Sequence, residues 1–162
     1  MRWSRENNMV LHEQKFELMV HRASKNPLLL ELPFASDMWS YQASECLQIS
    51  PVIELRDLGV TVNEDLSWSS HIHEIVSKAK SVAAWVLSVF RTRDRNVMLT
   101  LYKSLVRSHL EYCCPVWHPK KISDIEEVEE VQRVFTRKIL GMESLNYWDR
   151  LKRLSLMSLQ RR

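Results

Sequence analysis

The stretch WSSHIHEIVSKAKSVAAWVLSVF, residues 68–90, decides the fold. Its apolar residues recur at the three- and four-residue spacing that places side chains on one face of an α-helix. The predicted buried stripe consists of Ile72, Ile75, Val76, Ala79, Ala83, Val86, Leu87 and Phe90. Asp65 or Ser67 is placed to cap the start of the helix. The stretch therefore predicts one long amphipathic helix that packs against other helices.

A second helix is predicted at about residues 95–112, with Asp94 as its N-cap. Its apolar face carries Met98, Leu101, Tyr102 and Leu105. We expect it to end before Pro115, because proline has no amide hydrogen to donate and restricts the residue before it.

A third helix is predicted at residues 123–141, where Ser123 and Glu126 match a capping box and Gly141 marks the end. Acidic residues come first and basic residues last, which suits the helix dipole. The predicted buried stripe is Ile125, Val128, Val131, Phe135 and Ile139. A short fourth helix is predicted within YWDRLKRLSL, residues 147–156.

The residues before 66 favour short strands. KFELMVHR (15–22) alternates apolar and polar residues, one further strand is expected near residues 28–32, and ELRDLGVTV (54–62) is typical of a strand or hairpin arm. The expected fold class is therefore mainly α with a small β element. Short antiparallel strands in a first domain, residues 1–65, precede a bundle of three to four helices in residues 66–162.

The composition is that of a globular chain, with 162 residues, 45% hydrophobic and 27% charged, and only two glycines. A net charge of +3 and a pI near 8.8 permit nucleic-acid binding without requiring it. Three cysteines without framework spacing favour a reducing, intracellular compartment, with nucleus and cytoplasm both open. We expect no signal peptide and no membrane span.

Two patterns could carry chemistry. Cys113, Cys114 and His118 lie close in sequence, but paired zinc ligands are usually two to four residues apart. We expect both cysteines to be small buried groups at a helix end and no metal site. His71 and His73 point to different helix faces. No motif for nucleophilic catalysis is present, so we expect neither catalytic residues nor a small-molecule substrate.

Basic residues gather around the turn between the first two long helices and along the second. These candidates for phosphate contact are Arg91, Arg93, Arg95, Lys103 and Arg107. A second group, Arg150, Lys152, Arg153, Arg161 and Arg162, ends the chain. Such clusters suit a nucleic-acid backbone, and an ordinary charged surface explains them equally well.

Three segments together resemble one family: DLGVTVNEDLSWSSHIHEIVSKA (57–79), LYKSLVRSHLEYCCPVWHP (101–119) and IEEVEEVQRVFTRKILG (125–141). They are similar to the region downstream of the active site in reverse transcriptases of non-LTR, LINE-like and jockey-like retrotransposons. WSRENNMVLHEQKFELMVHR (3–22) resembles the segment after the catalytic motif. There Lys15 and Phe16 fit the family pattern, whereas His12 stands where the family usually has Asn. Residues 25–50 match weakly.

The resemblance implies RNA-directed DNA polymerisation with two magnesium ions held by paired carboxylates. Those carboxylates are absent from this sequence, which has no Asp-Asp pair, so we expect no cofactor in this chain and no activity from it alone. Leu58, Gly59 and Val60 resemble the primer grip, and the helices from 69 to 141 would form the thumb. The implied partners are an RNA–DNA or DNA duplex and an upstream polymerase domain.

Two alternatives stay open. The helices could serve as a protein-interaction or self-association module, for which Trp117 and Trp148 would be exposed aromatic contacts. The chain could also be one exon of a complete enzyme, in which case the polymerase activity belongs to the longer product.

Overall fold

The computed structural model describes residues 6–8, 15, 17–19, 41–44, 47–49 and 52–161. The chain divides into two compact units, residues 1–67 and 68–162. The strand predicted near 28–32 and much of the one predicted at 15–22 lie outside the described residues. Within the latter, the carbonyl oxygen of Leu18 accepts a hydrogen bond of 2.8 Å from the amide of Val52.

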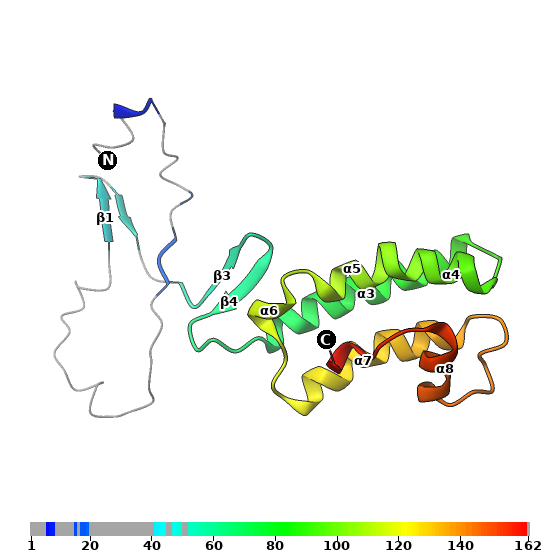
Figure 1. Ribbon diagram of the computed structural model, residues 1–162. Helices are drawn as coiled ribbons and strands as arrows, with labels where there is room; N and C mark the ends of the chain where they lie inside the picture. Colours follow the sequence, from blue (N-terminus) through cyan, green and yellow to red (C-terminus); the bar gives the residue numbers. More distant parts are fainter. Residues whose placement is uncertain are drawn as a thin grey trace. The chain divides into compact units, whose positions relative to one another are not determined.

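The first unit contains two antiparallel strand pairs (Figure 1). β1 (Tyr41–Ser44) pairs with β2 (Leu47–Ile49), and β3 (Glu54–Asp57) pairs with β4 (Val60–Asn63) in a regular register. The β3–β4 hairpin confirms the prediction for residues 54–62. The β1–β2 pair was not predicted, because its residues show no clean alternation of apolar and polar side chains.

Helix α3 (Ser69–Val89) opens the second unit. Five of the eight residues in the predicted stripe are buried, namely Ile72, Val76, Ala79, Ala83 and Val86, and the other three, Ile75, Leu87 and Phe90, are half-buried. The predicted cap is wrong, because the N-cap residue is Trp68, which makes no side-chain capping bond. A carboxylate oxygen of Asp65 instead accepts from the amide of Ser67, in the turn before the helix.

The second helical column consists of three segments: α4 (Arg95–Leu101), the π-helical turn η3 (Tyr102–Val106) and α5 (Arg107–Glu111). Its span confirms the helix predicted at 95–112. Asp94 caps it as predicted, since one carboxylate oxygen accepts from the amides of Asn96 and Val97 at 2.9 and 3.1 Å. The π-turn has no signature in the apolar pattern and was not predicted.

We expect Asp94→Ala to lower the free energy of unfolding of the helical unit by about 1 kcal/mol, because two amides at the start of α4 lose their acceptor. Asp94→Asn should cost far less, since asparagine caps almost as well. Urea titration followed by circular dichroism at 222 nm tests both variants. Equal stability of the alanine variant and the parent would contradict the assignment of this cap.

A single helical turn, α6 (Cys114–Trp117), precedes α7 (Ile122–Arg137). The capping box predicted for α7 is wrong. Its N-cap is Lys121, and the Ser123 hydroxyl donates to Asp124 rather than capping. The helix ends at Arg137, and Gly141 adopts φ of +74° in the turn that follows. α8 (Tyr147–Leu154) and the short 3₁₀ turn η4 (Leu159–Arg161) complete the unit.

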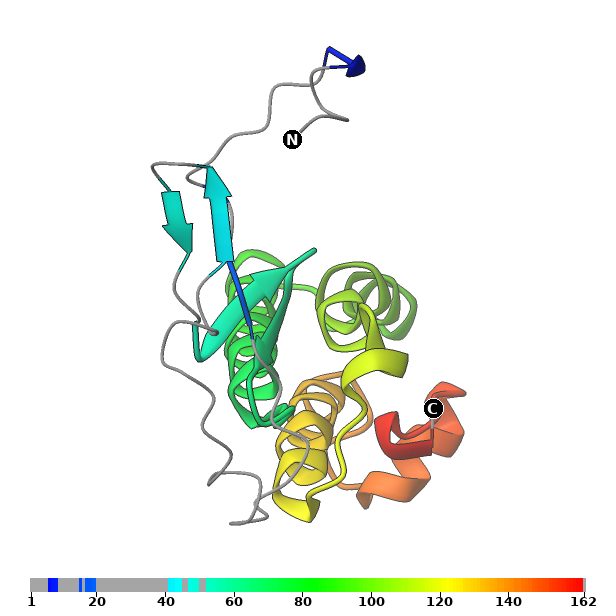
Figure 2. The ribbon, with the colours of Figure 1, turned by 90° about the vertical axis from the view of Figure 1, so that its left-hand side faces the viewer.

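α3, the α4–α5 column and α7 surround the core of the second unit, and Figure 2 shows all three nearly end-on. The largest fully buried side chains belong to this core: Trp117, Tyr102, Phe135, Ile72, Met98, Leu110, Ile139 and Leu154. The fold is mainly α with a small β element, which confirms the predicted class. Within the described part of the chain, no helix has the length and apolar character needed to cross a membrane.

Candidate nucleic-acid interface

Three of the five cations predicted to contact phosphate lie along the same side of the α4–α5 column. Arg95 donates from its guanidinium to the carbonyl oxygen of Arg153, at the end of α8. Lys103 and Arg107 line a pocket together with Ser155, two residues further on. The chain therefore builds a basic groove from two segments that are more than forty residues apart: the α4–α5 column and the end of α8.

The π-helical turn explains why these cations share a side. In a regular α-helix, Arg107 would be rotated about 120° around the axis relative to Arg95, because each residue turns by about 100°. In η3 the amide of Arg107 bonds to the carbonyl of Tyr102, five residues earlier. A π-turn rotates less per residue, so it brings Arg107 back toward the side of Arg95.

The pocket in this groove has a volume of about 360 Å³. It is lined by Lys103, Arg107, Glu111, Ser155 and Met157. Two cations and a hydroxyl outweigh one carboxylate, and ammonium, guanidinium and hydroxyl groups all donate to phosphate oxygens. The exposed Lys152 and Arg153 follow on α8, where they also suit the negative end of its dipole. The pocket can accept an anion.

Arg107 is not the exposed contact that its sequence position predicted. Its side chain is only 8% exposed, and Nε donates to a carboxylate oxygen of Glu111 at 2.6 Å. Packing against the core and this ion pair fix the guanidinium in the wall of the pocket. Arg107 thus holds one side of the site, and the exposed cation of the pocket is Lys103.

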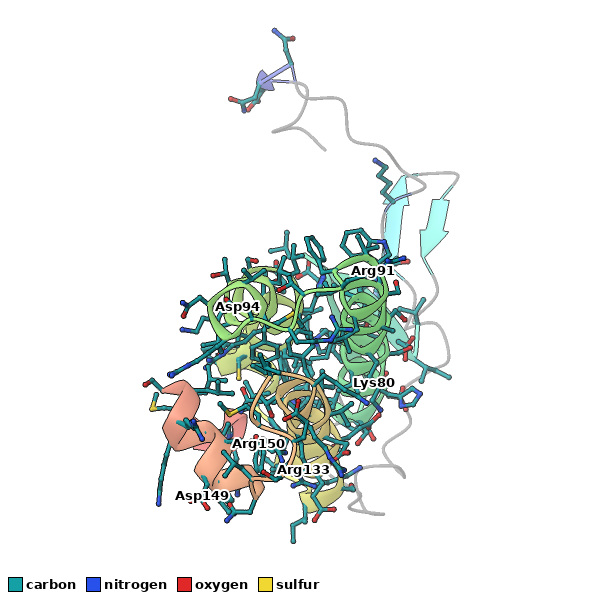
Figure 3. The ribbon with its side chains drawn as sticks, turned by 90° about the vertical axis from the view of Figure 1, so that its right-hand side faces the viewer. Lys80, Arg91, Asp94, Arg133, Asp149 and Arg150 are labelled. Carbon is teal, nitrogen blue, oxygen red and sulfur yellow. The ribbon has the colours of Figure 1, made fainter. Side chains whose placement is uncertain are left out.

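The other two predicted cations lie outside the groove. The guanidinium of Arg93 donates to the carbonyl oxygens of Leu87, at 2.9 Å, and Phe90, so it satisfies the last turn of α3. These bonds hold the guanidinium at the end of α3, and the contact of Arg93 with phosphate stays a prediction. Arg91 is exposed at the same end of the unit, which Figure 3 views directly.

The primer-grip-like residues form the turn of the β3–β4 hairpin. Leu58 and Gly59 have φ of +46° and +85°, the left-handed pair of angles that a two-residue hairpin turn requires. Glycine adopts this region freely, whereas leucine is strained there. The Leu58 side chain is 85% exposed and Val60 is buried. The backbone geometry of the turn is thus sufficient to explain why residue 59 is a glycine, and a closely packed nucleic acid is not needed to explain it.

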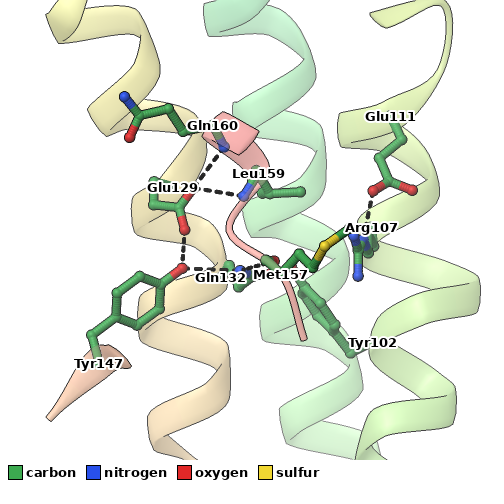
Figure 4. Close-up of polar contacts among 9 residues, drawn as sticks. All are labelled: Tyr102, Arg107, Glu111, Glu129, Gln132, Tyr147, Met157, Leu159 and Gln160. Atoms are coloured by element: carbon green, nitrogen blue, oxygen red, sulfur yellow. Dashed lines mark hydrogen bonds and ion pairs between the residues drawn. The ribbon is translucent and has the colours of Figure 1, made fainter. Parts of the chain in front are cut away.

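The segment after α8 forms one wall of the groove and is held by a buried polar network (Figure 4). Gln132 of α7 donates to the carbonyl oxygen of Met157 at 3.1 Å and accepts from the Tyr102 hydroxyl at 2.8 Å. Glu129 accepts from the amides of Leu159 and Gln160 at 2.8 and 3.2 Å. These bonds fix residues 157–160 against α7.

Two tyrosines complete this network. The Tyr147 hydroxyl donates to Glu129 and accepts from the Gln132 amide at 2.9 Å. Burial raises the pKa of Tyr102 well above its ordinary value. Burial, followed by the hydrogen bond to Glu129, does the same to the pKa of Tyr147. Both phenols therefore stay protonated at any physiological pH, and the donors of the network are retained.

The adjacent cysteines differ from the prediction, because Cys113 is exposed and Cys114 only half-buried. Cys113 lies between α5 and α6 and has a left-handed backbone, with φ of +57°. Cys114 lines a second, mostly apolar pocket of about 400 Å³ with Trp117 and His118. Burial, and then Glu111, raise the pKa of its thiol, so it is a poor nucleophile. The described residues contain no group of three metal-ligating side chains.

The fold and the groove define a class: a helical unit with a positively charged groove, preceded by a β-hairpin. Over 89 residues the chain is 28% identical to the probable RNA-directed DNA polymerase from transposon X-element of Drosophila melanogaster. The match covers 53% of this chain and 10% of that protein, so the chain spans a small part of its relative's length. This confirms the resemblance to the reverse transcriptase of a LINE-like element. No family model and no solved structure matches the chain.

Proposed function

We propose that this chain corresponds to the thumb side of a retrotransposon reverse transcriptase and that its basic groove binds the backbone of a template–primer duplex. The observation that carries the proposal is the groove itself. Arg95, Lys103 and Arg107 face the end of α8, although the two segments are distant in sequence. A surface charged only for solubility has no reason to gather cations around a formed pocket.

The groove suits a phosphate backbone better than a free small anion. Exposed cations continue from the pocket onto α8 through Lys152 and Arg153, and Arg95 lies at the far end of the same side. A row of cations matches a repeating phosphate chain, whose neutralisation releases counterions. Affinity in this groove should therefore fall steeply as salt increases.

The chain alone should not polymerise DNA. Two-metal nucleotidyl transfer needs paired carboxylates, and this sequence has no adjacent pair. Two of its aspartates have local structural roles, since Asp65 accepts from the amide of Ser67 in the turn before α3 and Asp94 accepts from amides at the start of α4. Polymerase activity would belong to a longer protein that supplies the missing carboxylates and holds the magnesium ions.

We expect Lys103→Ala to weaken binding to a labelled RNA–DNA hybrid several-fold and to lower the slope of log affinity against log salt by about 1. Lys80→Ala is the matched control, because Lys80 is an exposed lysine of α3, away from the groove (Figure 3). Fluorescence anisotropy at four salt concentrations measures both quantities.

Equal losses in the Lys103 and Lys80 variants would mean that binding follows net charge alone, and the groove would not be the site. If the parent chain shows no detectable binding to the hybrid at low salt, the proposal is refuted. The self-association alternative has lost part of its support, because Trp117 is 1% exposed and cannot contact a partner. Trp148 remains exposed.

A further inference from the structure

Trp148 is a large aromatic side chain left on the surface of α8 in a fixed position. It is 54% exposed, and its ring lies 5.4 Å from that of Tyr147 at an interplanar angle of 53°. Tyr147 is itself held by Glu129 and Gln132. The first turn of α8 is fixed too, because Asn146 accepts from the amide of Asp149 at 2.9 Å. The indole is thus an exposed surface on a rigid support.

Two guanidinium groups pack on the Tyr147 ring of this pair: that of Arg133, which also pairs with Glu130, and that of Arg150, which is only 5% exposed. The guanidinium carbon of Arg133 lies 5.2 Å from the centre of the Tyr147 ring, and that of Arg150 lies 5.6 Å from it. Arg133 and Arg150 lie close together in the end view of the unit (Figure 3). Lys152 follows Trp148 by four residues and is exposed. Of these cations Arg133 and Lys152 are exposed, and an exposed aromatic face near cations is the combination that binds nucleobases and their phosphates.

Trp148 is also aligned with the basic groove. Residues 148 and 152 follow the four-residue spacing that places side chains on one side of α8, and Ser155 is the left-handed residue that caps its end. Ser155 lines the pocket with Lys103 and Arg107. At 1.5 Å per residue, Trp148 lies about 10 Å along the helix from Ser155. An extended nucleic-acid strand covers that length in a few nucleotides.

We propose that this side of α8 binds a single-stranded segment of nucleic acid, with a phosphate in the pocket of Lys103 and Arg107 and a base stacked on Trp148. The inference rests on the proposed phosphate binding of the groove, and it adds that the bound nucleic-acid strand is unpaired. Bases inside a duplex are stacked on each other and cannot reach an indole, whereas those of an unpaired strand can. The ligand is therefore an overhang or an unpaired template segment.

The test uses the full chain and two labelled probes, a 12-nucleotide oligo(dT) and a blunt RNA–DNA hybrid. Trp148→Ala should weaken oligo(dT) binding about tenfold, the loss expected for one stacked base. Its affinity for the hybrid and the salt slope should not change, since no charge is removed. Trp148→Phe should recover much of the loss. Trp85→Ala is the matched control, because Trp85 is 55% exposed on α3.

The outcomes separate the two proposals. If Lys103→Ala weakens both probes and Trp148→Ala weakens neither, the groove binds phosphate and the stacking site is refuted. If Lys103→Ala also has no effect, the proposed function itself fails. A Trp148→Ala variant that changes only the oligomeric state in light scattering would assign the indole to a protein interface and overturn the inference.

Discussion

Gln132→Leu should lower the free energy of unfolding of the helical unit by about 3 to 5 kcal/mol, the largest loss we expect from a polar residue. Gln132 is 0% exposed and connects three groups: the hydroxyls of Tyr102 and Tyr147 and the carbonyl of Met157. Leucine fills a similar volume but leaves these groups buried without that partner, at a cost of about 1 to 3 kcal/mol each.

Urea unfolding followed at 222 nm measures this loss, with Tyr102→Phe as the control. Phenylalanine keeps the ring against Phe135, whose centroid is 5.1 Å away, and removes a single hydroxyl. The control should lose about 1 kcal/mol. Equal losses in the two variants would show that Gln132 contributes no more than its one bond to Tyr102.

Trp117→Ala should cost about 3 to 5 kcal/mol, the range for removing a large aromatic from a core. Trp117 is 1% exposed, packs edge-on against His71 at 5.5 Å and donates from its indole nitrogen to the Tyr112 carbonyl at 2.7 Å. Its loss opens a cavity between α3, α6 and α7, next to the apolar pocket. We expect partial unfolding near 37 °C.

Trp148→Ala is the matched comparison, because the same side chain is removed from a position that is 54% exposed. It should change stability by no more than about 0.5 kcal/mol. Thermal unfolding of both variants tests the pair. A Trp148 variant as unstable as the Trp117 variant would place the two indoles in equivalent environments, contrary to the structure. If the stability of Trp148→Ala is unchanged, the variant can be used in the binding experiment, because a loss of binding would then not result from unfolding.

Much of the fold could be predicted from sequence because local rules decide it. The three long helices follow from apolar spacing, and Asp94 was identified as a cap because its type and position are specific to helix starts. The β3–β4 hairpin followed from β-branched residues around Gly59. In these cases each residue's own preference agrees with the structure around it.

The site could be predicted only in part, because tertiary contacts decide which charged groups are free. Arg93 and Arg107 have the same charge and similar surroundings in sequence as Arg95. The guanidinium of Arg93 donates to carbonyl oxygens at the end of α3, and that of Arg107 is buried in an ion pair with Glu111. The role of Ser155 had no signal in the sequence, since only the fold brings it to Lys103.

The burial of Trp117 and the exposure of the two cysteines were equally beyond sequence patterns, whereas Trp148 is exposed as predicted. Trp117 lies in a single helical turn whose direction is set by the left-handed backbone of Cys113. That conformation turns the indole inward and leaves Cys113 outside. Short segments of this kind carry no period from which a buried face could be identified.

The π-turn η3 also constrains how the gene for this chain can change. In evolutionary terms such a turn is a one-residue insertion within an α-helix. Because the turn already absorbs that extra residue, deleting one codon there, for example that of Ser104, would restore regular helix and leave everything after it in its present orientation. Arg107 would keep its side of the column, and Leu110, 2% exposed, would stay in the core. A one-codon deletion within α4 or α5 would instead rotate the residues beyond it by about 100°, so a lineage can shorten this column by one residue only at the π-turn.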